Sequence, residues 1–200
     1  VKDGYAVRSE TEKGYQWTVN YIVSEDTTGF AQKGITAANS SYDFTVIVQD
    51  NGDGTLTSKV NYPEGESVIF TNVYSTGEPI ALNLSGSKIL KAEEGLLPDD
   101  ITGKFTFTLE GKDNAPMPSC NEVQNDKNGN ISFGNVTFSL DMLKDVKTAD
   151  DGSRTKVFKY VVSESGTMPG ITNDTEKDFT VILKDDGKGH LTANAGKGAM

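Results

Sequence analysis

Two glutamates end matching pentapeptides, Tyr21-Ile-Val-Ser-Glu25 and Tyr160-Val-Val-Ser-Glu164. In each pentapeptide apolar and polar residues alternate, which is typical of a β-strand with one buried face. Side chains two residues apart share a face, so each glutamate points to the same side as its tyrosine and middle valine. A carboxyl group in a core must be paired or protonated. The sequence therefore predicts two buried acids, each with a charged partner or with a proton to donate.

These acids belong to a chain whose short alternating runs predict β-strands. Glycine is frequent, at 21 residues of 200, and the turn sequence Asp50-Asn-Gly-Asp-Gly54 supplies residues that tolerate positive φ. We therefore expect an all-β fold with many turns, and a short helical turn within residues 141–156. The runs that we assign to strands are 16–24, 42–48, 55–60, 67–74, 80–90, 105–109, 131–133, 136–140 and 157–163.

The composition narrows the class of protein. Nineteen basic and 29 acidic residues give a net charge of 19 − 29 = −10, which argues against binding to nucleic acid or to anionic membranes. No apolar run reaches the roughly 20 residues of a membrane span. Cys120 is the one cysteine, so no intramolecular disulfide can form. Because no secretory signal or wall anchor is visible, we expect the 200 residues to be a piece of a longer chain.

An internal repeat divides the chain. Besides the two glutamate pentapeptides, three further landmarks recur in the same order, which predicts two copies of one module. The first copy would occupy residues 1–76, as the C-terminal part of a repeat without its early strands. The second would occupy residues 77–200 and lack its last strand, with a linker at 75–79 between them. The recurring landmarks are Gly34-Ile-Thr36 with Gly170-Ile-Thr172, Asp43-Phe-Thr-Val-Ile-Val48 with Asp178-Phe-Thr-Val-Ile-Leu183, and Asp53-Gly-Thr-Leu-Thr57 with Lys188-Gly-His-Leu-Thr192.

The joint order of several short motifs resembles the pilin isopeptide-linkage repeat of Gram-positive pilins and surface adhesins, a CnaB-like, immunoglobulin-like domain. The resemblance covers nearly the whole chain. It implies tandem immunoglobulin-like β-sandwiches. The motifs that carry it are Ser87-Lys-Ile-Leu90, Gly103-Lys-Phe-Thr-Phe-Thr-Leu109, Gly129-Asn-Ile-Ser-Phe133, Tyr160-Val-Val-Ser-Glu164 and Phe70-Thr-Asn-Val-Tyr74.

The resemblance also implies a self-modifying reaction. In that family a lysine on the first strand attacks the side-chain amide of an asparagine on the last strand, a buried acid assists, and ammonia leaves. The chemistry has a physical basis, because burial lowers the pKa of an amine and raises that of a carboxyl group. A folded β-sandwich also holds the reactants in contact, at a high effective concentration.

Carried onto this sequence, the resemblance makes Lys88 the reactive lysine, with Lys91 as a fallback, Glu25 and Glu164 the acids, and Asn72 the asparagine. Neither copy holds a complete set. Three alternatives stay open. The chain was cut from a tandem array and lacks parts of both bonds. Alternatively, residues 1–76 complete the N-terminal part of residues 80–140, in the same or another molecule, with Asn72 bonded to Lys88 and Glu25 as the assisting acid. In the third, the residues are ordinary and no bond forms.

The expected function is structural: a stalk segment of a cell-wall-anchored pilin or adhesin on the bacterial surface. The expected partners are neighbouring repeats, a second copy by strand complementation, or a host ligand. The alternative function is a ligand-binding adhesin domain that contacts a host protein or glycan through the loops at 112–128 and 141–156. We expect no turnover enzyme and no cofactor, because the sequence has no Ser/His/Asp set, phosphate loop or Cys/His cluster. Cys120 and His190 have no evident function, and 50–54 and 126–130 read as hairpin turns rather than calcium loops.

Overall fold

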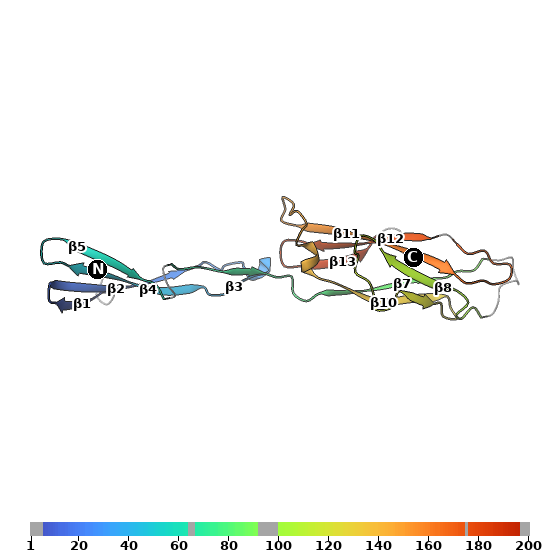
Figure 1. Cartoon of the computed structure of the whole chain (residues 1–200), viewed down its shortest axis with the longest axis horizontal. Coiled ribbons are helices and arrows are strands. Elements are labelled where there is room, and N and C mark those ends of the chain that lie inside the picture. The colour runs from blue at the N-terminus through green and yellow to red at the C-terminus, as the bar shows by residue number, and fades with distance from the viewer. Residues whose placement is uncertain (1–5, 64–66, 92–99, 175, 197–200) are drawn as a thin grey trace. The chain divides into compact units, whose positions relative to one another are not determined.

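The computed structural model describes residues 6–63, 67–91, 100–174 and 176–196, and it divides into two compact units (Figure 1). Unit 1 is Val1–Tyr74 and unit 2 is Ser75–Met200. Both consist of β-strands and short 3-10 turns, so the expected all-β fold is confirmed. The described part of the chain contains no helix long and apolar enough to cross a bilayer.

Unit 2 is a sandwich of two antiparallel sheets. The larger sheet has the strand order β13-β12-β11-β8-β9, and the smaller one pairs β10 with β7. A short 3-10 turn, η2 (Leu140–Leu143), follows β10. The strands are β7 (Ile80–Ser87), β8 (Thr106–Gly111), β9 (Glu122–Gln124), β10 (Asn130–Phe138), β11 (Arg154–Ser165), β12 (Lys177–Asp185) and β13 (Leu191–Ala195).

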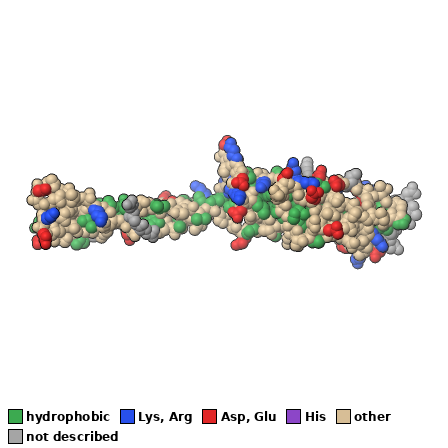
Figure 2. Space-filling model, in the orientation of Figure 1, with side chains coloured by type: hydrophobic (Ala, Val, Ile, Leu, Met, Phe, Trp, Pro, Cys, Tyr) green, Lys and Arg blue, Asp and Glu red, His purple; other side chains and the backbone are tan. Residues whose placement is uncertain are grey.

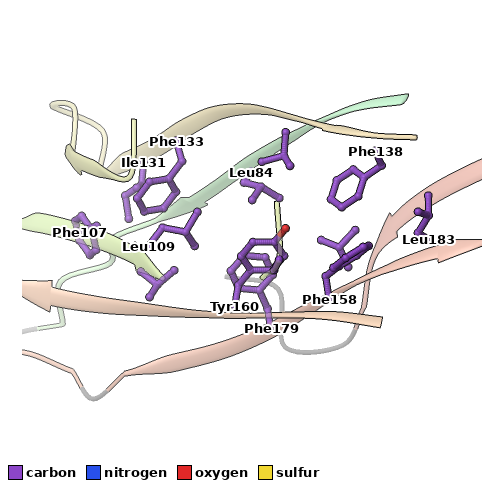
Figure 3. Packing of buried hydrophobic residues seen from close by; sticks show 14 of the residues in the cluster. Leu84, Phe107, Leu109, Ile131, Phe133, Phe138, Phe158, Tyr160, Phe179 and Leu183 are labelled. Atoms are coloured by element: carbon purple, nitrogen blue, oxygen red, sulfur yellow. The ribbon is translucent and has the colours of Figure 1, made fainter. Parts of the chain in front are cut away.

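The core of unit 2 lies between these two sheets (Figure 3). The inward residues alternate along each strand, as a half-buried strand requires. The small sheet contributes Leu84, Ile131, Phe133, Val136 and Phe138. The large sheet contributes Phe107, Leu109, Phe158, Tyr160, Val162, Phe179, Val181 and Leu183.

Unit 1 repeats the part of unit 2 that follows β10. Its four-stranded antiparallel sheet has the order β1-β2-β4-β5, and β3 pairs with β6 beside it. The elements are β1 (Ala6–Thr11), β2 (Gly14–Ser24), the 3-10 turn η1 (Ala31–Lys33), β3 (Ile35–Ala37), β4 (Ser41–Asp50), β5 (Leu56–Asn61) and β6 (Asn72–Tyr74).

The repeat extends to individual ring contacts. Tyr21 of β2 stacks on Phe44 of β4 with ring centroids 5.2 Å apart, and Tyr160 of β11 stacks on Phe179 of β12 at 5.1 Å. The burial differs, because Tyr160 is completely buried whereas Tyr21 is 46% exposed. No described residue of unit 1 falls in the buried class, and hydrophobic side chains reach its surface (Figure 2). Unit 1 therefore has the sheet of the module without the covering sheet that β7 and β10 supply in unit 2.

Four expected strands differ from the observed ones. The strand expected at 67–74 is confined to β6, because β3 offers it only three paired residues. The strand expected at 80–90 ends at Ser87, where pairing with β10 stops, so Lys88 follows the strand instead of lying on it. The runs at 131–133 and 136–140 form one strand, β10, with a register shift between Ser132 and Gly134.

Candidate functional site

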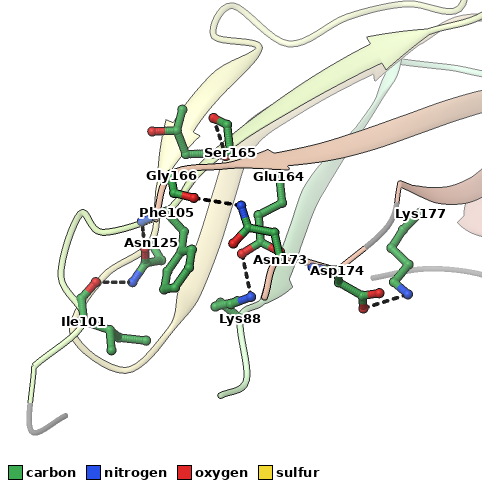
Figure 4. A network of polar contacts seen from close by, with 11 residues as sticks. Lys88, Ile101, Phe105, Asn125, Glu164, Ser165, Gly166, Asn173, Asp174 and Lys177 are labelled. Atoms are coloured by element: carbon green, nitrogen blue, oxygen red, sulfur yellow. Dashed lines mark hydrogen bonds and ion pairs between the residues drawn. The ribbon is translucent and has the colours of Figure 1, made fainter. Parts of the chain in front are cut away.

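A buried ion pair occupies one end of the unit 2 sandwich (Figure 4). Lys88 Nζ lies 2.5 Å from Glu164 Oε1, and the two side chains are only 9% and 7% exposed. Glu164 is near the end of β11, on the face that also carries Tyr160 and Val162, as the alternation predicts. The structure thus brings together the lysine and the acid that the sequence singles out.

The aromatic ring of Phe105 forms one wall of this pair. Lys88 Nζ lies 4.4 Å from the ring centroid, within the range of a cation–π contact, and Phe105 itself is fully buried. The backbone N–H of Phe105 donates a hydrogen bond to the side-chain oxygen of Asn125 at 3.1 Å. Asn125, which is 2% exposed, donates in turn to the carbonyl of Ile101 at 2.8 Å. A buried amide therefore fixes the backbone that presents the ring to Lys88.

A tight turn sets the position of Lys88. The Lys88 N–H donates to the Gly129 carbonyl at 2.7 Å. Gly129 has a φ of +83°, and a Cβ there would overlap the Lys88 carbonyl oxygen. Asp126 Oδ1 accepts hydrogen bonds from the backbone N–H groups of Asn128 and Asn130, both at 2.8 Å. Residues 126–130 thus form a hairpin turn in which the Asp126 carboxylate accepts hydrogen bonds from the turn's own backbone. The hydrogen bond between Lys88 and Gly129 holds the lysine next to Glu164.

The second oxygen of Glu164 contacts the segment after β11. Glu164 Oε2 accepts a hydrogen bond from the backbone N–H of Asp174 at 3.2 Å. Asn173 lies beside it and donates to the carbonyl of Gly166 at 2.8 Å (Figure 4). Lys91 lines a groove beside the Lys88–Glu164 pair but is exposed, so the geometry favours Lys88 over this fallback.

Unit 1 presents a different part of the same constellation. Asn72 Nδ2 donates to Glu25 Oε1 at 2.8 Å, so the second predicted acid meets the predicted asparagine. Asn72 opens β6, opposite Ala37 of β3, and the Glu25 N–H is fixed by the Ser40 carbonyl at 3.0 Å. Glu25 Oε2 is buried and has no hydrogen-bond partner within the described part of the chain. This oxygen, Glu25 Oε2, is therefore available to accept a hydrogen bond from a cation.

Taken together, the two glutamates display complementary contacts. Among the described residues, Glu164 contacts an ammonium group but no asparagine amide, whereas Glu25 contacts the amide but no ammonium group. The roles of these four residues in a reaction remain a prediction. Phe105 and Asn125 were not assigned a role from the sequence. The alternation of 105–109 predicted a strand there, but no local signal marks Asn125, whose side chain binds residues 20 and 24 positions away as well as the neighbouring Asp126.

Unit 2 thus combines an antiparallel β-sandwich with a buried lysine–glutamate pair whose lysine directly follows the first strand. The sequence comparison gives the family. The chain matches the FctA family, described as the Spy0128-like isopeptide containing domain, over residues 8–75 and 84–199. The chain belongs to this family, and the two matched segments correspond to tandem repeats. Comparisons with curated proteins and with solved structures found no match.

Proposed function

We propose that this chain is a structural stalk segment of a Gram-positive pilin or surface adhesin, and that its modules are stabilised by autocatalytic Lys–Asn isopeptide bonds. The observation that carries the proposal is the buried pair of Lys88 and Glu164 against the ring of Phe105. Two charges that share a nearly dry pocket are costly unless they serve a purpose or stabilise each other very well. Membership of an isopeptide-containing family supplies that purpose.

The reaction needs one proton to move before the bond forms. Transfer of a proton from Lys88 Nζ to Glu164 Oε1 leaves a neutral amine beside a carboxylic acid. The amine attacks the side-chain carbonyl carbon of an asparagine, while the acid donates to the amide oxygen as negative charge develops there. The C–N bond to the original amide nitrogen breaks, ammonia leaves with the protons released, and Glu164 ends as it began. One amine and one carboxamide become one secondary amide and one ammonia.

Such a bond would make the module a mechanical link. It joins the end of the first strand to the closing strand, so tension applied along the stalk passes through covalent bonds and the residues between are not pulled apart. It also restricts the unfolded chain, as a disulfide closing a long loop does. Extracellular proteins are often stabilised by disulfides, but Cys120 has no second cysteine in the chain to pair with. An isopeptide bond would supply the missing covalent link. The parent would be anchored to the cell wall.

A chain extended by one strand tests the proposal. Leu56 and Leu191 occupy equivalent positions, an offset of 191 − 56 = 135, so residue 200 corresponds to residue 65. Appending a copy of residues 66–77 directly after Met200 therefore places an asparagine at the spacing that Asn72 has in unit 1. We expect the intact mass to fall by one ammonia relative to the sequence mass, with Lys88 joined to the appended asparagine.

The matched control is Glu164→Gln in the same extended chain, which keeps size and hydrogen bonding but has no acidic proton. It should keep the full mass. The bond should also make the parent extended chain resist urea better than the control. If the chain with all three groups shows its unshifted sequence mass after prolonged incubation, the isopeptide chemistry is wrong.

A further inference from the structure

A groove opens beside the Lys88–Glu164 pair in unit 2. Its volume is about 790 Å³, and its walls include Phe107, Ile131 and Val162, which are all at least nine-tenths buried. Residues 170–174 form its far edge. A groove with apolar walls, a charged pair at its base and a backbone edge on one side has the features of a site for an extended peptide.

The edge residues show that a strand partner is missing from the described part of unit 2. Gly34-Ile-Thr36 and Gly170-Ile-Thr172 have the same sequence, and in unit 1 this segment enters strand β3 by pairing with β6. In unit 2 the described residues 171–174 belong to no strand. Identical local sequence thus forms a strand where a partner is present and none in unit 2, where the described residues supply no strand beside it.

Hydrogen bonds around the glutamates support the same conclusion. In unit 1 the N–H of Ala38 donates to the Thr71 carbonyl at 2.9 Å, beside the closing strand. The equivalent N–H in unit 2 is that of Asp174, and it donates to Glu164 Oε2 instead. A seated strand would take over the Asp174 N–H and free that carboxylate oxygen for an asparagine amide, as Glu25 binds Asn72 in unit 1.

We propose that this groove receives residues 67–74 of a second copy of the chain, and that Lys88 of one copy becomes covalently joined to Asn72 of the other. The inference rests on the proposed function, since it uses the same reaction with a partner molecule as the source of the asparagine. The register of unit 1 fixes the pairing. Ile35 opposite Tyr74 and Ala37 opposite Asn72 translate into Ile171 opposite Tyr74 and Asn173 opposite Asn72 of the second copy.

The chemistry of the segment fits the groove. Alternation puts Val68, Phe70 and Tyr74 on the same face as Asn72, so three apolar side chains would enter the apolar walls while the amide meets Glu164. The segment is flanked by Glu66 and Glu78, and the groove rim carries Lys91 and Lys177. Lys177 also pairs with Asp174 Oδ2 at 2.8 Å, so Lys91 contributes most of the attraction for the acidic ends of the segment.

The exchange is also inexpensive for the donor. In unit 1 the segment has three ladder pairs with β3 and a few contacts besides, among them the Asn72–Glu25 hydrogen bond and the contacts of Tyr42 with Ile69 and Phe70, and no described residue of that unit is buried. Moving it to unit 2 would keep an equivalent pairing and add contacts with a formed core, which is the logic of domain swapping. The described part of each copy has one donor segment and one acceptor groove, and the contact is heterologous. Repetition therefore produces head-to-tail covalent chains instead of a closed dimer.

Two variants separate donor from acceptor. Lys88→Arg cannot form the bond but keeps Asn72, so it can act only as donor; Asn72→Ala keeps Lys88 and can act only as acceptor. We expect each variant alone to stay monomeric on a reducing, denaturing gel. Their mixture should give a covalent dimer and no longer species, whereas the unchanged chain should give a ladder. Reducing conditions remove any disulfide dimer through the exposed Cys120.

Peptide mapping of the dimer should show Lys88 joined to Asn72 with the loss of one ammonia. The acceptor Asn72→Ala with Glu164→Gln added should not react. A mixture that stays monomeric, or that pairs without a bond, overturns this inference. If the strand-extended chain described above still loses ammonia, only the intermolecular step fails; if it does not, the proposed function fails as well. Labelling of the acceptor by a synthetic 66–77 peptide but not by the donor chain would overturn the second copy as the occupant.

Discussion

Removing the ammonium group of the buried pair is the sharpest test of how unit 2 is stabilised. Lys88→Met keeps an unbranched side chain of similar length and leaves the Glu164 carboxylate without its cation. Breaking one side of a buried ion pair costs about 3–5 kcal/mol, because the remaining charge stays desolvated. Glu164 keeps the hydrogen bond from the Asp174 N–H, so we expect the lower end, about 3 kcal/mol.

A loss of about 3 kcal/mol corresponds to a change on the order of 100-fold in the opening equilibrium of β11. Hydrogen exchange read by mass spectrometry measures this change on peptides from β11 and β12. Peptides from β2 and β4, and the fluorescence of Trp17, report on unit 1 in the same sample and should not change, because the pair lies wholly in unit 2.

Two further variants make the result decisive. Lys91→Met removes an exposed lysine from the same groove. It should change the opening free energy obtained from hydrogen exchange by less than about 0.5 kcal/mol. Adding Glu164→Gln to Lys88→Met removes the unpaired carboxylate charge. It should restore at least about 1 kcal/mol of the lost opening free energy. Two results would refute this reasoning. Either Lys88→Met exchanges hydrogen at the rate of the unchanged chain, or the double variant exchanges as fast as the single one. In both cases the unpaired charge of Glu164 does not destabilise unit 2.

Three other outcomes follow from burial and backbone geometry. Burial raises the pKa of Tyr160 from 10.0 to about 12, so the unfolded state loses its phenol proton first. The free energy of unfolding should fall between pH 10 and pH 12, and Tyr160→Phe should flatten that decline in urea titrations. Val181→Ala, at a fully buried site, should cost about 2 kcal/mol in the same titrations, and the equivalent but partly exposed Val46→Ala clearly less. Gly129→Ala should lower the thermal unfolding temperature more than Gly134→Ala does. The two glycines have similar φ values, +83° and +87°, but only the Cβ added at residue 129 would clash with backbone atoms, those of Lys88.

The sequence predicts the fold well where the signal is local. Alternation in Tyr160-Val-Val-Ser-Glu164 predicts a strand with an inward glutamate, and the structure confirms both. The pairing of Lys88 with Glu164 is different, since the two residues are 76 positions apart (164 − 88) and only the resemblance linked them. The partners of Asn125, and the hydrogen bond from Asp174 to Glu164, depend on loop conformations set by tertiary contacts. No periodicity encodes such contacts.

The segment at 67–74, for which the sequence predicts a longer strand than is observed, shows how these modules depend on their last strand. Residues 67–74 alternate cleanly, yet only Asn72–Tyr74 pair, and the matching Gly170-Ile-Thr172 segment forms no strand where its partner is absent from the described residues. A strand is stabilised by the edge that it joins, so alternation alone marks a segment that is able to pair. In unit 1 the pairing brings Asn72 to Glu25, and in unit 2 the matching segment lines the same groove as Lys88 and Glu164. If the proposed reaction occurs, strand closure would also bring the lysine, the glutamate and the asparagine together, and the bond would make that closure irreversible.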